Sequence, residues 1–450
     1  MEFLDKLVLP QSAEHIELLH YMIILVLSLF IPFISVILGG TTISLYFRKK
    51  GLESGNPVYL RFAGDVINML TINKSMGIIL GIVPLLTCIL VFAQLLHTAN
   101  VSTISYLAGT FVLTAISIIL IYTYRYSLSF TNIFNSIEHL KHDDQDLKEE
   151  LDKFRKGNRS LSLKSGRYGI VLLYLALWIF TAAITLAVYT NKWGSENFLI
   201  LLFSWQVLSN YIQLIAAAFA LTGGAILFGF FYWEGGRKNL SDDYKNFIGK
   251  TSAKVTLTAA LLQPLFLLIN LFALPEAALS LSVFTYAFIA LFLLFLAYHY
   301  LYATLKETSV KYSGKIFYVL LFSLISLIAK DQLAMGNATK EHSTILIAEF
   351  DKYLAELKGT DAGIEQLSGK EIYEIRCASC HQFDRKLVGP PHNEVLPKYA
   401  GNKEQLVAFI RNPVKVDPAY PPMPNPGLKP NEADAVAAYL LERFEELKQK

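Results

Sequence analysis

Long apolar segments alternate with short polar ones over the first 330 residues of the chain. Eight of these segments are long and apolar enough to form helices across a bilayer, which takes about 20 residues each. The predicted helices cover residues 18–46, 74–97, 103–126, 168–190, 207–233, 253–274, 279–305 and 314–330. A further apolar stretch, Phe198–Leu208, is predicted to lie along the membrane surface before the fifth helix. The pattern therefore predicts an all-α transmembrane bundle in residues 1–330.

The pattern changes after Ala329, where the chain becomes polar. We expect residues 331–357 to form a linker over 331–344 and a lead-in helix over 345–357. Residues 358–450 are then a separate domain, with helices predicted at Gly369–Arg376, Asn402–Arg411 and Pro430–Leu447. Within the bundle, residues 131–166 are highly charged but keep apolar positions at helical spacing. They are predicted to continue the third helix as a helical hairpin.

Composition supports a membrane protein. The chain has 450 residues, of which 53% are hydrophobic and 17% charged, and its mean hydropathy is +0.41. This excludes an ordinary water-soluble protein, and the net charge of +3 gives no reason to expect a nucleic-acid partner. No basic region or small-residue cleavage site precedes the first apolar segment, so that segment is expected to be retained as a helix.

The stretch Cys377-Ala-Ser-Cys-His381 carries chemistry that can be named. C-x-x-C-H is the attachment signature of a c-type haem, in which two thiols add to the porphyrin's vinyl groups and the histidine ligates the iron. A zinc site would need more Cys or His nearby, and the one remaining cysteine, Cys88, lies in an apolar segment. A thioredoxin-like pair would sit in a βαβ pattern, which is absent here. The motif therefore predicts one covalent haem c held by Cys377 and Cys380, with His381 as proximal ligand.

A sixth ligand to the haem iron is predicted on a loop rich in proline. Met423 lies in Tyr420-Pro-Pro-Met-Pro424, and a thioether on a proline-stiffened loop suits an axial ligand because the loop has little freedom to lose. His392 follows the turn Gly389-Pro-Pro391 and is the next candidate for this role, although we expect it to lie on the surface.

Residues 345–450 resemble a class I monohaem cytochrome c. The positions of that family's pattern are filled by Gly369, Tyr373, Cys377, Cys380, His381, Pro390, Met423 and Tyr439. The resemblance implies that the glycine and aromatic residue of the first helix cross the last helix near Tyr439. It also implies that the carbonyl group of Pro390 accepts the N–H of the proximal histidine.

Orientation follows from two independent arguments. Haem is attached to c-type cytochromes outside the cytoplasm, so the C-terminal domain is expected outside, and eight crossings then place the N-terminus outside as well. Lysine and arginine are retained in cytoplasmic loops. The predicted inner loops are rich in both, whereas the predicted outer turns near 98–102, 191–197 and 275–278 carry only Lys192. Both arguments predict a multi-pass protein of the cytoplasmic membrane with its haem domain on the periplasmic side.

The N-terminal part is similar to the large subunit of cytochrome bd quinol oxidases. The similarity rests on His20 at the start of the first helix, on Thr71-Ile-Asn-Lys-Ser-Met-Gly77 at the second, and on Gln213–Trp233 at the fifth. The sequence also departs from that family. Gln213 stands where the family has a haem-ligating histidine, the third helix contains no acid, and the quinol loop shrinks to Leu274–Ala278. An oxygen-reducing site is therefore not expected.

Two features of the bundle leave alternatives open. His20 and His97 lie at outer helix ends, where they either bond water and carbonyl groups or hold one b-type haem between them. The polar residues at membrane depth either bond helix to helix or form a quinone pocket. They are Gln94, Gln206, Asn210, Gln213, Gln263 and Asn270.

The sequence thus predicts a membrane-bound c-type cytochrome that serves as an electron-transfer subunit of a respiratory membrane complex. Its expected partners are other membrane subunits and a soluble external electron carrier, with a quinone as a further candidate. We expect an electron-transfer component rather than a complete enzyme. Two alternatives remain: a quinol-oxidising bd-like enzyme, and a transporter or sensor whose haem domain reports redox state. The scarcity of charge deep in the helices counts against a path for charged solutes.

Overall fold

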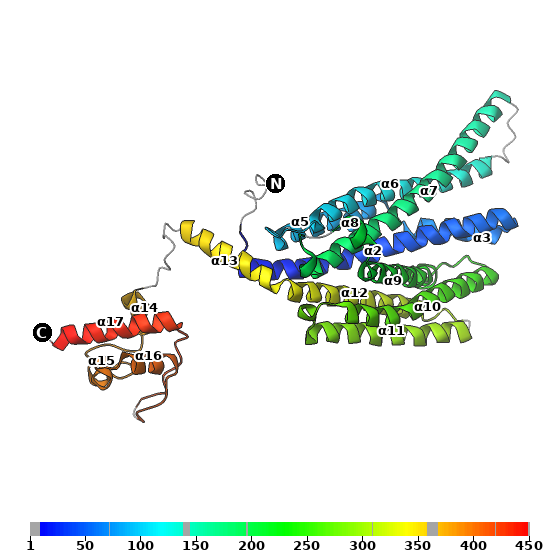
Figure 1. The fold of residues 1–450 in the computed structure, drawn as a ribbon. Helices are drawn as coiled ribbons and strands as arrows, with labels where there is room; N and C mark the ends of the chain where they lie inside the picture. The colour runs from blue at the N-terminus through cyan, green and yellow to red at the C-terminus, as the bar shows by residue number, and fades with distance from the viewer. Residues whose placement is uncertain are drawn as a thin grey trace. The chain divides into compact units, whose positions relative to one another are not determined.

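The computed structural model describes residues 10–71, 73–137, 145–194, 197–307, 309–357, 368–418 and 420–448. These residues form helices joined by turns and loops, and none of them lies in a strand. They divide into two compact units, Met1–Phe350 and Asp351–Lys450 (Figure 1). The all-α fold class predicted from the sequence is therefore confirmed.

Eight helices among the described residues are long and apolar enough to cross a membrane, as the hydrophobic pattern predicts. They are α2 (Ala13–Ser54), α5 (Val83–Leu95) with α4 (Lys74–Met76) and the π-helical turn η1 (Gly77–Ile82) before it, α6 (Thr103–Ile137), α7 (Gln145–Val188), α9 (Trp205–Phe231), α10 (Asp242–Ala273), α11 (Leu281–Glu307) and α12 (Ser313–Ala338). Several extend past the predicted segments because the helix continues into polar residues at its ends.

Two short helices complete the bundle. Helix α3 (Pro57–Leu70) follows α2, begins with proline in its first turn, and is capped by the side chain of Asn56. Helix α8 (Phe198–Leu202) covers the first part of the stretch expected along the membrane surface. The rest of that stretch belongs to α9, because Ser204 caps a new helix that starts at Trp205.

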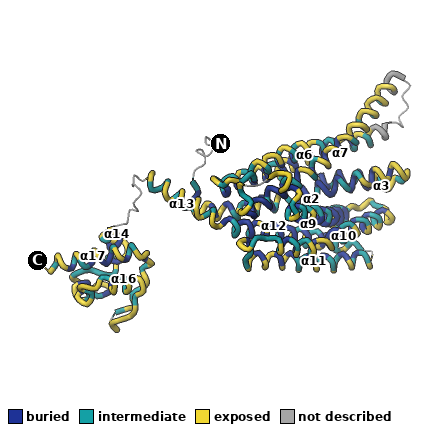
Figure 2. Tube along the Cα trace, in the orientation of Figure 1, coloured by how far each residue is buried: buried dark blue, intermediate teal, exposed yellow. Residues whose placement is uncertain are grey.

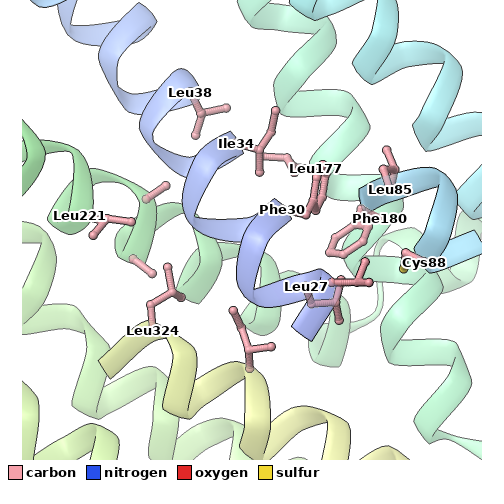
Figure 3. Packing of buried hydrophobic residues seen from close by; sticks show 14 of the residues in the cluster. Leu27, Phe30, Ile34, Leu38, Leu85, Cys88, Leu177, Phe180, Leu221 and Leu324 are labelled. Carbon is pink, nitrogen blue, oxygen red and sulfur yellow. The ribbon is translucent and has the colours of Figure 1, made fainter. Parts of the chain in front are cut away.

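Helix α2 lies at the centre of the bundle's packing. It contacts α3, α5, α7, α9 and α12, and Figure 3 shows its apolar side chains facing several of these neighbours. The rings of Phe30 on α2 and Phe180 on α7 lie 5.5 Å apart, and Leu27 and Ile34 are fully buried beside them. Small residues allow close approach, since a Cβ added to Gly39 would lie 2.7 Å from the Cβ of Thr222 on α9. Such close packing drives helix association where water is absent.

Helices α6 and α7 continue together beyond the bundle as a largely exposed helical pair (Figure 2). This agrees with the hairpin expected over residues 131–166, although residues 138–144 lie outside the described part of the chain. At the base of the pair, the Ser127 hydroxyl donates to Asn158 Oδ1 at 2.6 Å. We call this end of the bundle, where α2 and α6 end and α7 begins, the hairpin end.

The opposite end of the bundle carries the turns η2 (Thr190–Lys192) and η4 (Glu276–Ala278) and the end of α12. The Asn337 side chain donates to the carbonyl oxygen of Ala278 at 3.1 Å and so ties α12 to η4. We call this the α13 end, because helix α13 (Lys340–Leu357) begins there.

Residues 331–344, expected as a polar linker, are helical except at Thr339. Helix α12 runs on to Ala338, and α13 starts one residue after Thr339. The helix persists because one side of the segment is packed within the membrane unit: Gln332 and Met335 are buried, and Gly336 lies against the His20 ring on α2. The lead-in helix expected over 345–357 is the second part of α13.

The C-terminal unit consists of α14 (Gly369–Arg376), α15 (His392–Val395), the 3₁₀ turn η5 (Leu396–Tyr399), α16 (Lys403–Arg411) and α17 (Pro430–Lys448). Its core joins Tyr373, Leu406 and Leu440 from three of these helices. Helices α14 and α17 cross closely at Gly369, where an added Cβ would lie 2.7 Å from Tyr439 Cβ and still closer to the Ala435 carbonyl oxygen. The rings of Tyr373 and Tyr439 lie 5.6 Å apart at the same crossing.

Candidate haem site

The C-x-x-C-H motif forms an extra turn at the end of α14. The helix begins with a capping box between Ser368 and Glu371, which satisfies backbone donors at its start. At its end, the backbone N–H groups of Cys380 and His381 both donate to the carbonyl oxygen of Cys377, at 3.0 and 2.9 Å. The two cysteines therefore lie within one turn, and His381 follows directly after it. Both thiols are free, as thioether formation with a haem requires.

The imidazole of His381 is held on its Nδ1 side. That nitrogen lies 3.1 Å from the carbonyl oxygen of Pro390, which is the contact that the resemblance to class I cytochromes implies. A hydrogen bond from Nδ1–H to a carbonyl group fixes the tautomer and leaves Nε2 free to ligate a metal. The Tyr373 hydroxyl donates to the His381 carbonyl oxygen at 2.9 Å and anchors the backbone at the same residue.

Gly389 brings the Gly-Pro-Pro turn against the face of His381. Its backbone N–H donates to the Cys380 carbonyl oxygen at 2.9 Å. A Cβ added to Gly389 would lie 2.7 Å from His381 Nδ1 and closer still to Cε1, which is too short for any real contact. A residue without a side chain is therefore needed here, because the backbone itself packs against the imidazole.

A cavity opens beside this histidine and is walled mainly by apolar residues from η5, α16, α17 and the loop after α16. Four of the predicted site residues line it: Cys377, His381, Pro390 and Met423. Cys380 is partly exposed and is not part of the lining. An imidazole, a thioether and a thiol around one apolar cavity suit a covalently attached haem, because the imidazole and the thioether can both ligate iron and the apolar wall limits access of water. The residues present therefore fit the predicted cofactor.

His392 is buried, which corrects the expectation that it lies on the surface. Only 7% of the residue is exposed, and its ring stacks on His381 with centroids 5.1 Å apart and planes inclined by 19°. The cause is local, because the backbone N–H groups of His392 and Asn393 donate to the carbonyl oxygens of Gln382 and Phe383 and fold the segment back onto the motif. His392 also lines the cavity, so it has access to the same site as Met423.

Burial determines the protonation of the groups around the cavity. Burial, with a smaller contribution from Cys380, raises the pKa of the Cys377 thiol. Burial likewise raises the pKa of Tyr373 to about 12. For His392, burial and then the neighbouring His381 lower the pKa to about 4. All three groups are therefore neutral at pH 7.

The histidines proposed for a b-type haem have different neighbours in the structure. His20 on α2 packs against Gly336 on α12. His97, at the end of α5, lies beside His342 on α13, whose side chain hydrogen-bonds to the His97 backbone. His342 was not singled out from the sequence because it lies in the polar segment after the last apolar run. A b-type haem between His20 and His97 stays an untested alternative to the single haem c.

Three of the polar residues predicted at membrane depth line a second cavity, inside the bundle; they are Asn210, Gln213 and Asn270. Gln213 Oε1 accepts a hydrogen bond from Asn270 Nδ2, and Asn270 Oδ1 accepts one from Ser209 at 3.0 Å. The side chain of Lys330, which is 1% exposed, lines the same cavity and pairs with Asp331 at 2.6 Å. The cavity has a volume of about 120 Å³. Gln213 Nε2 is buried there with no hydrogen-bond partner among the described residues.

The contact between Gly389 and His381 yields a test. Replacing Gly389 with Ala should push the imidazole away from Pro390 and destabilise the haem-loaded domain by about 1–3 kcal/mol, the usual cost of overpacking. The measurement is thermal unfolding of the full-length protein followed by Soret absorbance. Val388→Ala is the matched control, because the Val388 side chain is exposed. Equal unfolding temperatures for the two variants would contradict the proposed contact.

The C-terminal domain has recognisable relatives. Residues 365–440 match the family described as "Cytochrome C oxidase, cbb3-type, subunit III". The chain is 34% identical over 79 residues to cytochrome c-551 of Pseudomonas denitrificans and 36% identical over 78 residues to cytochrome c-551 of Azotobacter vinelandii. Each match covers 16% of this chain and 95% of the relative.

No solved structure matches the chain. The matches lie in the C-terminal domain, so the similarity of residues 1–330 to cytochrome bd oxidases stays a prediction. The motif and the matched family agree on the C-terminal domain, and eight of the described helices are long and apolar enough to cross a membrane. Through its C-terminal domain the chain belongs to the cytochrome c family, and it is a multi-pass membrane protein that transfers electrons through a covalent haem c.

Proposed function

We propose that this protein is an electron-transfer subunit of a respiratory membrane complex, with residues 1–330 as its membrane domain and residues 358–450 as its haem domain. The observation that carries the proposal is the arrangement around His381, whose Nδ1 faces the Pro390 carbonyl oxygen and whose ring borders a cavity shared with Met423. This arrangement sits in a chain whose first unit is an eight-helix bundle. One helix would suffice as an anchor, so the bundle supports docking to other membrane subunits.

Each site residue has a distinct role in this proposal. Cys377 and Cys380 would hold the haem covalently, and His381 and Met423 would ligate its iron. Pro390 keeps the imidazole in one orientation and tautomer. When bound, the haem supplies exchange of single electrons between ferrous and ferric iron. The chain's own contribution is to exclude water through the apolar cavity wall and to set the potential through the Met423 sulfur, because a thioether ligand favours ferrous iron.

Loss of the ligating residues tests this assignment. The double variant Cys377→Ser with Cys380→Ser should show no covalent haem staining after denaturing electrophoresis. The Met423→His variant should keep the stain, lose the weak near-infrared sulfur-to-iron band of the oxidised protein, and shift to a lower potential.

Two results would contradict the assignment. Staining that survives in the double-cysteine variant would remove the proposed attachment. A near-infrared band that persists in Met423→His would move the sixth ligand elsewhere, and His392 is the first alternative because it lines the same cavity.

We further propose that the α13 end faces the periplasm and the hairpin end faces the cytoplasm, in the cytoplasmic membrane. Basic residues support this orientation, because the hairpin end is crowded with lysine and arginine from α2, α3, α7 and the turn before α10. The opposite turns, η2 and η4, contain one lysine, Lys192. In this orientation a soluble external carrier has access to the haem domain.

Cysteine labelling tests the orientation. In a Cys88→Ser background, K156C on the hairpin and E276C in η4 can each be probed with a membrane-impermeant maleimide in intact spheroplasts; both native residues are exposed. E276C should react in intact cells and K156C only after lysis. The reverse pattern would invert the topology.

A quinone is the small-molecule partner that the cavity inside the bundle supports. Its volume of about 120 Å³ is close to that of a 150 Å³ cavity that holds benzene, so it takes a single ring. Gln213 Nε2 offers an unused donor and Lys330 a buried ammonium group, which suit the carbonyl oxygens of a quinone ring. Electrons from such a quinol would reach the haem directly or through another subunit.

Retained quinone is the readout for this partner. Extraction of the purified full-length protein should yield bound quinone, and Gln213→Leu should lower its amount about tenfold, since a hydrogen bond in a dry site is lost. Gln206→Leu, on the same helix but not in the cavity wall, should retain it. Equal quinone content in both variants would exclude this cavity as the binding site.

A further inference from the structure

A third cavity, at the hairpin end of the bundle, is lined by an excess of positive charge. Its walls come from α2, α3, α6 and α7, and its volume is about 720 Å³. Its charged lining residues are four arginines and one acid, namely Arg48, Arg61, Arg155, Arg159 and Asp65. Arginine on a cytoplasmic surface is ordinary when it is solvated. One of the four, Arg48, is buried.

Arg48 is not solvated, because only 8% of the residue is exposed. Its Nη1 donates to the Ser162 hydroxyl at 2.8 Å, and its guanidinium carbon lies 5.6 Å from the centre of the Tyr124 ring. Among the described residues, Arg48 forms no ion pair with a carboxylate. A buried charge without a counter-charge is costly, whereas pairing with an anion compensates it. Among the described residues, the partners of Arg48 are neutral.

Asp65 does not provide that counter-charge. Its carboxylate accepts a hydrogen bond from Tyr244 at 2.8 Å and pairs with Arg237 at 3.3 Å and with Arg61 at 3.7 Å. Tyr244 lies on α10 and Arg237 in the turn before it, so the Asp65 carboxylate is already paired on that side. The cavity therefore keeps the positive charge of Arg48 and Arg159, whereas Arg155 pairs with Asp152 at 4.0 Å.

We propose that this cavity binds a phosphate group, carried either by the headgroup of an anionic phospholipid or by a free phosphate compound. The planar, multiply donating guanidinium group matches phosphate oxygens, and basic pockets between membrane helices are suited to anionic headgroups. Arg48 would bind from the floor of the cavity and Arg159 from its rim. Leu52, Leu60 and Leu128 in the same wall provide apolar contact for the remainder of a lipid. This site is separate from both the haem cavity and the quinone cavity.

The test uses the haem-loaded full-length protein in nanodiscs. Three preparations are compared: phosphatidylcholine alone, phosphatidylcholine with 20 mole per cent (about one lipid in five) phosphatidylglycerol, and phosphatidylcholine with inorganic phosphate in the buffer. The readouts are the thermal unfolding temperature of the protein and the phospholipid or phosphate that native mass spectrometry finds bound to it. If phosphatidylglycerol stabilises the protein and inorganic phosphate does not, the ligand is a lipid headgroup. If both stabilise it, the phosphate group alone is sufficient for binding.

Arginine variants connect the binding to the cavity. Arg159→Gln changes an exposed side chain and should weaken the binding about tenfold, since a charge-assisted hydrogen bond is lost; Arg48→Gln should weaken it at least as much. Lys156→Gln removes an exposed charge from the same helix outside the cavity wall and serves as the control. Haem content and monodispersity show whether each variant is folded. If Arg48→Gln does not fold, Arg159→Gln still tests the proposal.

The proposal is overturned by either of two results. The first is that neither phosphatidylglycerol nor phosphate stabilises or stays bound to the protein. The second is that Lys156→Gln weakens the binding as much as Arg159→Gln does, which would show a diffuse surface effect rather than a site.

Discussion

The hydrogen bond between His381 Nδ1 and the Pro390 carbonyl oxygen, 3.1 Å long, is the contact on which the haem site of the C-terminal domain depends. It requires the Gly-Pro-Pro turn to lie against the imidazole, which is possible because residue 389 has no side chain. It also requires α14 to end at Arg376, so that the motif can turn from its cap residue Cys377 onward. Nε2 is then left unbonded by the Pro390 contact, and His381 lines the same cavity as Met423. The local backbone thus prepares the coordination geometry before the iron contributes to it.

The bundle follows a different physical rule. Side chains that face lipid are as apolar as those between the helices, so hydrophobicity does not show which side chains are in the interior of the bundle. Its charged and amide side chains are therefore the informative ones. Lys330 lies near the α13 end with Asp331, and Arg48 lies at the hairpin end with a hydroxyl group and an aromatic ring. Each lines a cavity. The two ends of the bundle therefore carry the sites that we propose for a quinone ring and for a phosphate group.

Sequence reasoning succeeded where a signal is local or periodic. The eight spans follow from hydropathy alone, and C-x-x-C-H names its cofactor because two thiols and an imidazole at that spacing have one dominant use. It failed where tertiary packing decides. His392 looks like a surface residue until backbone hydrogen bonds to Gln382 fold it inward, and residues 331–338 look like a linker until α2 packs beside them. The arginine cavity could not be predicted from the sequence, because Arg48 and Arg159 are 111 positions apart along the chain.

The central claim is that a single covalent haem c carries the electrons of this chain. A pyridine haemochrome spectrum of the purified full-length protein, combined with a redox titration of its visible absorption, tests this most directly. The account predicts one haem c per chain and one titration step that fits a single one-electron transition. A second step, or a non-covalent haem in stoichiometric amount, would contradict it and would restore the bd-like enzyme as the better description of the bundle.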